Sequence, residues 1–143
     1  MHLMDTAGQE DYAELRVLGL KDADCFLMCF SVADKVTFRN IEDVWLPEIR
    51  SRNSKAKILL VGTKADLRKA KGHRASTMSM RGKGVSWSSI ERCVTKQKLD
   101  GYVETSSKQK PEQLDAVFEK AVRLGLGLVE EGEEANIPCC IVN

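Results

Sequence analysis

The sequence CFLMCFSV, residues 25–32, is a nearly unbroken run of apolar side chains. Ile58-Leu59-Leu60-Val61 is a second such run, and Tyr102-Val103 is a shorter third one. A strand that helices cover on both faces is apolar at successive positions, whereas a strand with one face in water alternates. The three runs therefore predict buried strands of a parallel sheet.

Apolar residues between the first two runs recur at helical spacing. They predict one amphipathic helix on Phe38, Ile41, Trp45 and Ile49. Pro47 lies near the end of this pattern. Because proline lacks an N–H and its ring clashes with the preceding turn, Pro47 should kink or end the helix.

Two more helices are predicted on either side of the third run. Ser88 and Glu91 have capping-box spacing and predict the start of one helix, and Pro111 suits the first turn of the last helix. The residues expected to face inward from the last helix are Leu114, Val117, Phe118, Ala121 and Val122. Alternating strands and helices predict an α/β fold, with a mostly parallel sheet, right-handed crossovers and helices on both faces.

The composition excludes several classes of protein. The 143 residues are 43% hydrophobic and 30% charged, which is typical of one folded domain and not of a disordered or collagen-like chain. With 22 Lys+Arg against 21 Asp+Glu, any basic site must be local. No apolar run approaches the ~20 residues that span a bilayer. Five cysteines without a paired spacing pattern indicate a cytoplasmic protein rather than a disulfide-linked secreted domain.

Several conspicuous residues are expected to be structural. Cys25, Cys29 and Cys93 are predicted to be packed in the core, and Trp45 and Trp87 are expected to be packing residues rather than platforms for a ligand. His2 and His73 have no companion at metal-ligand spacing, so no zinc site is predicted. No nucleic-acid interface is predicted either, because no aromatic residue interrupts the basic cluster of residues 68–83.

The first motif that could carry chemistry is Asp5-Thr6-Ala7-Gly8-Gln9-Glu10. An aspartate at the end of a strand can hold Mg²⁺ through water, and Gly8 would let a backbone N–H approach a terminal phosphate. Gln9 could then orient an attacking water. The alternative is a polar turn without a ligand.

A second motif, Val61-Gly62-Thr63-Lys64-Ala65-Asp66, follows the second predicted strand directly. The carboxylate of Asp66 can accept hydrogen bonds from the N1–H and the 2-amino group of guanine, which adenine cannot supply. The stem of Lys64 could lie over the base. The alternative is that Asp66 only caps the loop.

A third motif, Glu104-Thr105-Ser106-Ser107-Lys108, follows the third predicted strand. Its backbone N–H groups could meet a base carbonyl, and Lys108 could cover the other face of the ring. Because an open α/β sheet binds ligands beyond the carboxyl ends of its strands, the three motifs are predicted to converge on one edge.

These motifs and their order resemble the small GTPases of the Ras superfamily, and most closely the Rho family. The residues that carry the resemblance are DTAGQEDY (5–12), FLMCFSV (26–32), VWLPEI (44–49), LLVGTKADLR (59–68), ETSSK (104–108) and CCIVN (139–143). The resemblance implies a Ras-like fold of the P-loop NTPase type. It also implies a switch that binds GTP or GDP with Mg²⁺ and hydrolyses GTP.

The resemblance also assigns roles to individual residues. Asp5 and Gly8 would belong to the Mg²⁺ and γ-phosphate loop, and Gln9 would position the hydrolytic water. Residues 10–20 would form the second switch. The guanine would be recognised by Thr63, Lys64, Ala65, Asp66, Ser106, Ser107 and Lys108. Exchange factors, GTPase-activating proteins and effector proteins are the implied partners.

One expected motif does not occur in the 143 residues. GTPases use G-x-x-x-x-G-K-[ST] to hold the β- and γ-phosphates, and here Gly84 follows the single Gly-Lys pair, Gly82-Lys83. The first switch is missing as well. We therefore expect a truncated chain that binds and hydrolyses GTP poorly and is poorly soluble, with residues 25–32 left as an exposed strand edge.

The chain is predicted to consist of one domain and a tail. Residues 1–129 are predicted to be a truncated GTPase domain, with a basic Rho-type insert at 68–84 that carries six Lys/Arg by residue 83. Residues 130–143 form an acidic tail that ends in a C-a-a-X-like box, which predicts prenylation of Cys140, with Cys139 as a second lipid site. The chain would then reach the cytoplasmic face of a membrane. The other hypothesis is a nucleotide-free module or decoy that binds GTPase regulators or effectors.

Overall fold

The computed structural model describes residues 2–5, 19–68 and 84–128. Within them, the chain forms a three-stranded parallel sheet in the order β1-β2-β3. The strands are β1 (Cys25–Ser31), β2 (Lys57–Thr63) and β3 (Gly101–Glu104). They coincide with the three apolar runs, so the predicted parallel sheet is confirmed.

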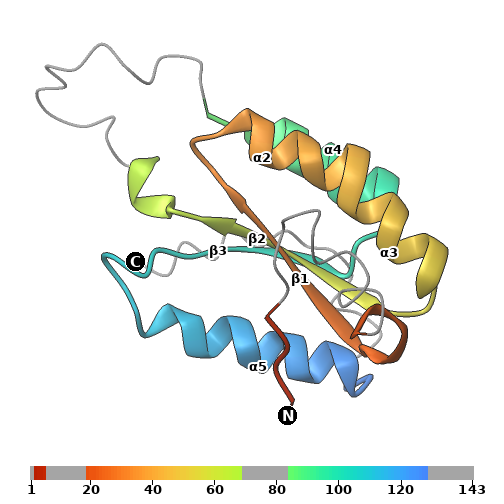
Figure 1. Ribbon diagram of the computed structural model, residues 1–143. Coiled ribbons are helices and arrows are strands. Elements are labelled where there is room, and N and C mark those ends of the chain that lie inside the picture. Colours follow the sequence, from red (N-terminus) through yellow and green to blue (C-terminus); the bar gives the residue numbers. More distant parts are fainter. Residues whose placement is uncertain (1, 6–18, 69–83, 129–143) are drawn as a thin grey trace, which may run out of the picture.

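Helices cover both faces of this sheet, as predicted. The first stretch is α2 (Lys35–Asn40), a π-helical segment (Ile41–Trp45) and α3 (Leu46–Arg52), and the later helices are α4 (Trp87–Gln97) and α5 (Gln113–Gly125). A 3₁₀ turn, Ala65–Leu67, follows β2. α2, α3 and α4 lie on one face, and α5 lies on the other (Figure 1). None of the helices in the described residues is long and apolar enough to span a bilayer.

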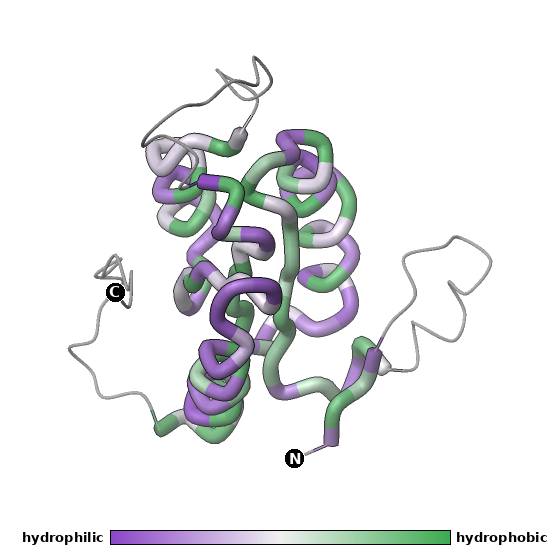
Figure 2. The backbone as a smooth tube through the Cα atoms, turned by 90° about the vertical axis from the view of Figure 1, so that its left-hand side faces the viewer, coloured by the Kyte–Doolittle hydropathy of each residue, from purple (hydrophilic) through white to green (hydrophobic). Residues whose placement is uncertain are grey.

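The alternation of side chains along each strand creates two hydrophobic clusters. Met28 and Phe30 of β1 point into the larger one, with residues of α2, α3 and α4. Leu59 and Val61 of β2 point into the smaller one, with α5. Each helix carries both hydrophilic and hydrophobic residues (Figure 2), as expected for helices that bury one face.

Pro47 does not end the first helix. It occupies the first turn of α3, which continues to Arg52. The π-helical segment immediately before it explains why, since the N–H of Leu46 donates to the carbonyl of Ile41, five residues back. This wider turn falls where the proline ring would clash with an ordinary α-helical carbonyl, so the helix is interrupted rather than ended.

The starts of the last two helices also differ from the predictions. The N-cap of α4 is Ser86, whose Oγ accepts from the N–H of Ser89 at 3.2 Å, and Ser88 lies inside the helix. Pro111 precedes α5 by two residues, in a turn where its carbonyl accepts from the N–H of Leu114. Val117 and Ala121 are buried, as predicted, whereas the other predicted inward residues are only half-buried.

The core prediction was wrong for Cys29. Cys93 is buried, but Cys29 is exposed and Cys25 is half-buried. β1 is an edge strand of the described sheet, pairing with β2 on one side. Cys25 and Leu27 pack against the cluster beside α5, whereas Cys29, on the same face of β1, is exposed.

Candidate functional site

β2 and β3 end side by side at one edge of the sheet. Gly62 is paired with Glu104 in the parallel register. Beyond this pair, the N–H of Thr105 donates to the carbonyl of Gly62 at 2.9 Å, and the N–H of Ala65 donates to the carbonyl of Thr105 at 3.1 Å. The loops that follow the two strands are thus joined by backbone hydrogen bonds, and the predicted meeting of these two loops is confirmed.

The loop after β2 turns sharply at Lys64. This residue has φ 59° and ψ 39°, the left-handed conformation that costs a non-glycine residue roughly 1–2 kcal/mol. The turn is closed by the N–H of Leu67, which donates to the carbonyl of Lys64 at 2.9 Å. Lys64 itself is exposed, so its side chain is available to a ligand, while the 3₁₀ turn brings Asp66 back over the end of the sheet.

Asp66 and Ser106 are in direct contact. The hydroxyl of Ser106 donates to Oδ1 of Asp66 at 2.6 Å. The Ser106 hydroxyl also accepts from the N–H of Gln109 at 3.3 Å, and Ser106 is 5% exposed, which holds its side chain in one position. An ionised carboxylate offers about four acceptor positions, so Asp66 can still accept hydrogen bonds from a ligand.

The other predicted residues of these two loops play different parts. The hydroxyl of Thr63 donates to the carbonyl of Phe30 at 2.9 Å, and this hydrogen bond links the end of β2 to β1. Ala65 contributes its backbone N–H to the pairing with Thr105. Ser107 and Lys108 are exposed in the turn after Ser106.

The first predicted motif does not join this edge in the described residues. Asp5 is exposed, and its neighbour Met4 lies against Gly19. The carbonyl of the next residue, Leu20, accepts a hydrogen bond from the side chain of Asn53, which precedes β2. That is the amino end of β1, about 20 Å from its carboxyl end at the usual rise per residue. Figure 1 draws residues 2–5 at the bottom of the view, whereas β2 and β3 end on its left. Thr6, Ala7, Gly8 and Gln9 lie outside the described residues.

The described residues provide no group of three or more His, Cys, Asp and Glu side chains that could hold a metal ion. Asp5 remains a single carboxylate apart from Asp66. Among the described residues, the structure thus brings Asp66 and Ser106 together at this edge, and the assignment of Mg²⁺ to Asp5 stays a prediction.

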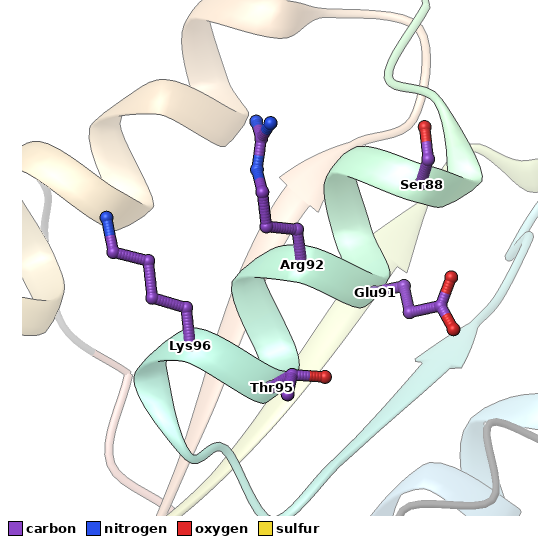
Figure 3. Close-up of a pocket in the computed structure, with 5 residues that line it drawn as sticks. All are labelled: Ser88, Glu91, Arg92, Thr95 and Lys96. Carbon is purple, nitrogen blue, oxygen red and sulfur yellow. The ribbon is translucent and has the colours of Figure 1, made fainter.

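A surface hollow of about 390 Å³ lies elsewhere, along the outside of α4 (Figure 3). All of its lining residues belong to this helix, and they are Ser88, Glu91, Arg92, Thr95 and Lys96. Arg92 and Lys96 point to one side of it, and Glu91 points away from them. None of the predicted site residues contributes, so this hollow is separate from the edge formed by Asp66 and Ser106.

Arg68, Tyr102 and Glu104, for which the sequence predicts no joint role, are hydrogen-bonded to one another next to this edge. Nε of Arg68 donates to Oε1 of Glu104 at 2.7 Å, and Nη1 of Arg68 donates to the carbonyl of Val85 at 2.7 Å. The hydroxyl of Tyr102 donates to the same Oε1. Burial, together with this hydrogen bond to Glu104, raises the pKa of Tyr102, so its hydroxyl stays protonated as a donor. In the sequence, Arg68 is the first charge of the basic segment and the last residue of the LLVGTKADLR motif, and neither pattern predicts these contacts.

With this geometry established, comparison with known proteins identifies the family. The model of the Ras family matches residues 1–126. The chain belongs to the Ras family. Two relatives connect it to the Rho branch: the Rho-related GTP-binding protein RhoV of mouse and human is 57% identical over 68 residues, and the Ras-like GTP-binding protein RhoL of Drosophila melanogaster is 38% identical over 123 residues.

These matches cover unequal shares of the chains. The RhoV match spans 48% of this Ras-family chain and 29% of RhoV, and the RhoL match spans 85% of this chain and 58% of RhoL. The chain is thus a Rho-family member of the Ras superfamily, as predicted, and its α/β architecture is consistent with the Ras-like fold. The chain thus spans only part of these relatives, 29% of RhoV and 58% of RhoL.

Proposed function

We propose that this chain forms the base-recognition side of a guanine-nucleotide switch that alternates between GTP and GDP. The observation that supports it is the 2.6 Å hydrogen bond from Ser106 to Asp66, at the edge where β2 and β3 end. Ser106 orients the carboxylate of Asp66, and the left-handed turn at Lys64 presents this carboxylate beside the exposed Lys64 side chain.

The proposed selectivity follows from donor and acceptor patterns. The carboxylate of Asp66 would accept from the N1–H and the 2-amino group of guanine, and a hydrogen bond to a charged group contributes about 1.5–3 kcal/mol. Adenine presents an acceptor at N1 and would leave the carboxylate without a donor. The stems of Lys64 and Lys108 would lie over the two faces of the ring.

The hydrolytic part of the proposal rests on the family. GTP hydrolysis by these proteins needs positioning and charge neutralisation more than covalent chemistry, because water attacks the γ-phosphate directly. Gln9 is the proposed residue for orienting this water. The family also assigns Mg²⁺ to Asp5 through water, a role that would require Asp5 to lie nearer the carboxyl end of β1 than it does in this structure. Exchange factors, GTPase-activating proteins and effectors are the partners proposed on the same ground.

Base selectivity provides the direct test. We expect the 143-residue chain to bind GDP with a Kd of roughly 1 mM, since contacts to the base must offset the association entropy without the phosphate-binding motif. Inosine diphosphate lacks the 2-amino group and should bind about 10-fold more weakly. Asp66→Asn should remove this difference, while Asp115→Asn, on the exposed first turn of α5, should preserve it. Ligand-observed NMR titrations measure all of these affinities.

Two results would contradict the proposal. One is equal binding of GDP, inosine diphosphate and ADP by the unaltered chain. The other is an unchanged preference for GDP in the Asp66→Asn variant. The first result would favour the alternative of an interaction module that binds GTPase regulators or effectors without a nucleotide, and the second would mean that groups other than Asp66 recognise the base.

We also propose that a lipid attached to Cys140 brings the chain to the cytoplasmic face of a membrane. The support is the Cys-Ile-Val-Asn box at 140–143, with Cys139 as a site for a second lipid. These residues lie outside those the structure describes. In cells, Cys140→Ser should move most of the chain from the membrane fraction to the soluble fraction, and Cys29→Ser should leave the distribution unchanged. Equal partitioning of both variants would overturn the lipid proposal.

A further inference from the structure

Arg68, Glu104 and Tyr102 form a hydrogen-bonded cluster below the edge that carries Asp66 and Ser106. The side chains of Arg68 and Glu104 are 21% and 13% exposed, so their ion pair is largely shielded from water. Arg68 closes the 3₁₀ turn that contains Asp66, because its N–H donates to the carbonyl of Ala65 at 3.0 Å. Glu104 is the last residue of β3 and lies two residues before Ser106. The ion pair therefore joins the base of one loop to the base of the other.

The same guanidinium also reaches the segment before α4. Its Nη1 donates to the carbonyl of Val85, and its Cζ lies 5.0 Å from the centroid of the Trp87 ring. Val85 is in turn held to the sheet, since its N–H donates to the carbonyl of Val32 at 2.9 Å. Trp87 packs edge-on against Tyr102, with 5.8 Å between ring centroids. The Arg68 side chain thus joins the last residue of the described segment 19–68 to the beginning of the described segment 84–128.

Lysine could not replace this arginine. Glu104 and Val85 are bound through two different nitrogens of one planar guanidinium, and its Cζ lies over the Trp87 ring. A lysine ammonium is a compact point charge without this planar fork, so it would not reproduce both hydrogen bonds together with the position over Trp87. The side chains of Tyr102 and Glu104 also leave no room for a side chain at Gly62 of β2, because a Cβ there would meet Tyr102 Oη and come within 3.1 Å of Glu104 Cγ.

We infer that Arg68 and Glu104 form a clasp that sets the distance between the Asp66 loop and the Ser106 loop, and that Arg68 is thereby a positioning residue for guanine selectivity. The clasp itself stands on the contacts above, while its effect on the base rests on the function proposed in the preceding subsection. Its loss should let the two loops separate even though Asp66, Ser106 and their own hydrogen bond are chemically unchanged.

Amide hydrogen exchange tests the clasp without any nucleotide. The N–H groups of Ala65 and Thr105 report on the two loops, and the N–H of Asp100, bonded to the carbonyl of Ile58 at 2.9 Å, reports on the opposite end of β2. In Arg68→Met we expect Ala65 and Thr105 to exchange at least about 10-fold faster than in the unaltered chain, with a smaller change at Asp100. Arg68→Lys should have an intermediate effect.

A matched control removes another Arg–Glu pair. Arg52 and Glu48 are 3.9 Å apart on the surface of α3, and Arg52→Met should leave the exchange at Ala65 and Thr105 unchanged. Equal acceleration at Ala65, Thr105 and Asp100 in Arg68→Met would overturn the clasp, because it would mean a general loss of stability. Glu104→Gln keeps the shape of the side chain and one acceptor oxygen but removes the charge. The exchange at Ala65 and Thr105, compared with Asp100, should therefore change in the same direction as in Arg68→Met but by less.

Nucleotide selectivity tests the positioning role separately. In Arg68→Met and Glu104→Gln, the GDP preference over inosine diphosphate should fall from about 10-fold to about 3-fold or less. If the unaltered chain shows no preference, the proposed function fails while the exchange experiment still decides the clasp. If the unaltered chain has the preference and both variants retain it in full, the positioning role is wrong.

Discussion

Replacing Phe30 with alanine is expected to lower the free energy of unfolding by about 3–5 kcal/mol. Phe30 is 2% exposed at the centre of the larger hydrophobic cluster. Its ring meets that of Phe38 edge-on, with 4.9 Å between centroids, and stacks with that of Tyr102 at 6.2 Å. Alanine would leave a cavity that the two neighbouring rings, fixed on α2 and β3, cannot fill.

Urea denaturation followed by circular dichroism measures this loss. The midpoint should fall with little change in the slope, because the surface exposed on unfolding is nearly the same. Val36→Ala, at a residue that is 62% exposed, should change the stability by no more than about 0.5 kcal/mol. A loss below about 1 kcal/mol in Phe30→Ala would contradict the packing of the Phe30 ring against Phe38 and Tyr102 described above.

Gly62→Ala is expected to destabilise the chain by about 1–3 kcal/mol, as overpacking usually does. A Cβ at this position would lie 2.9 Å from Val32 Cγ1 and 3.1 Å from Glu104 Cγ, and would also meet Tyr102 Oη. Exchanging glycine for alanine inside a strand normally favours folding by about 0.5–1 kcal/mol. Because β2 is central and these neighbours are held by the clasp, the steric cost should exceed this gain.

A double-mutant cycle with Tyr102→Phe isolates the cause. Tyr102→Phe alone removes the hydrogen bond to Glu104 and should cost about 0.5–1.5 kcal/mol. In the Gly62→Ala background it also removes the closest obstacle to the new methyl group, so its cost should be smaller. Strictly additive losses in urea denaturation, or a stabilising Gly62→Ala, would show that the hydroxyl does not limit the space at Gly62.

Local chemistry made most of the secondary structure predictable. The three apolar runs became strands because continuous burial requires apolar residues at every position, and α4 formed around Ile90 and Val94 as their spacing indicated. The errors lay where neighbours in space compete with local signals. Ser86 and Ser88 are both plausible caps, and the hydrogen bond to Ser89 selects the first. Cys29 resembles a core residue, but it is exposed on β1, an edge strand of the described sheet.

Part of the candidate site was also predictable from the sequence. The sequence placed Asp66 and Ser106 after neighbouring strands, and parallel strands bring such loops to one edge. It did not indicate Arg68 and Glu104 as partners, because 36 residues separate them and each has a simpler local interpretation as a loop charge.

The sequence by itself determined the strands, the helices and the family of this chain, because hydrophobic periodicity and motif order depend on residues close together along the chain. Only the tertiary structure decided that Ser106 bonds to Asp66 and that Arg68 joins Glu104 to Val85. Those contacts depend on the register of β2 against β3 and on the path of the chain into α4, and side chains far apart in sequence acquire their partners only when these elements pack.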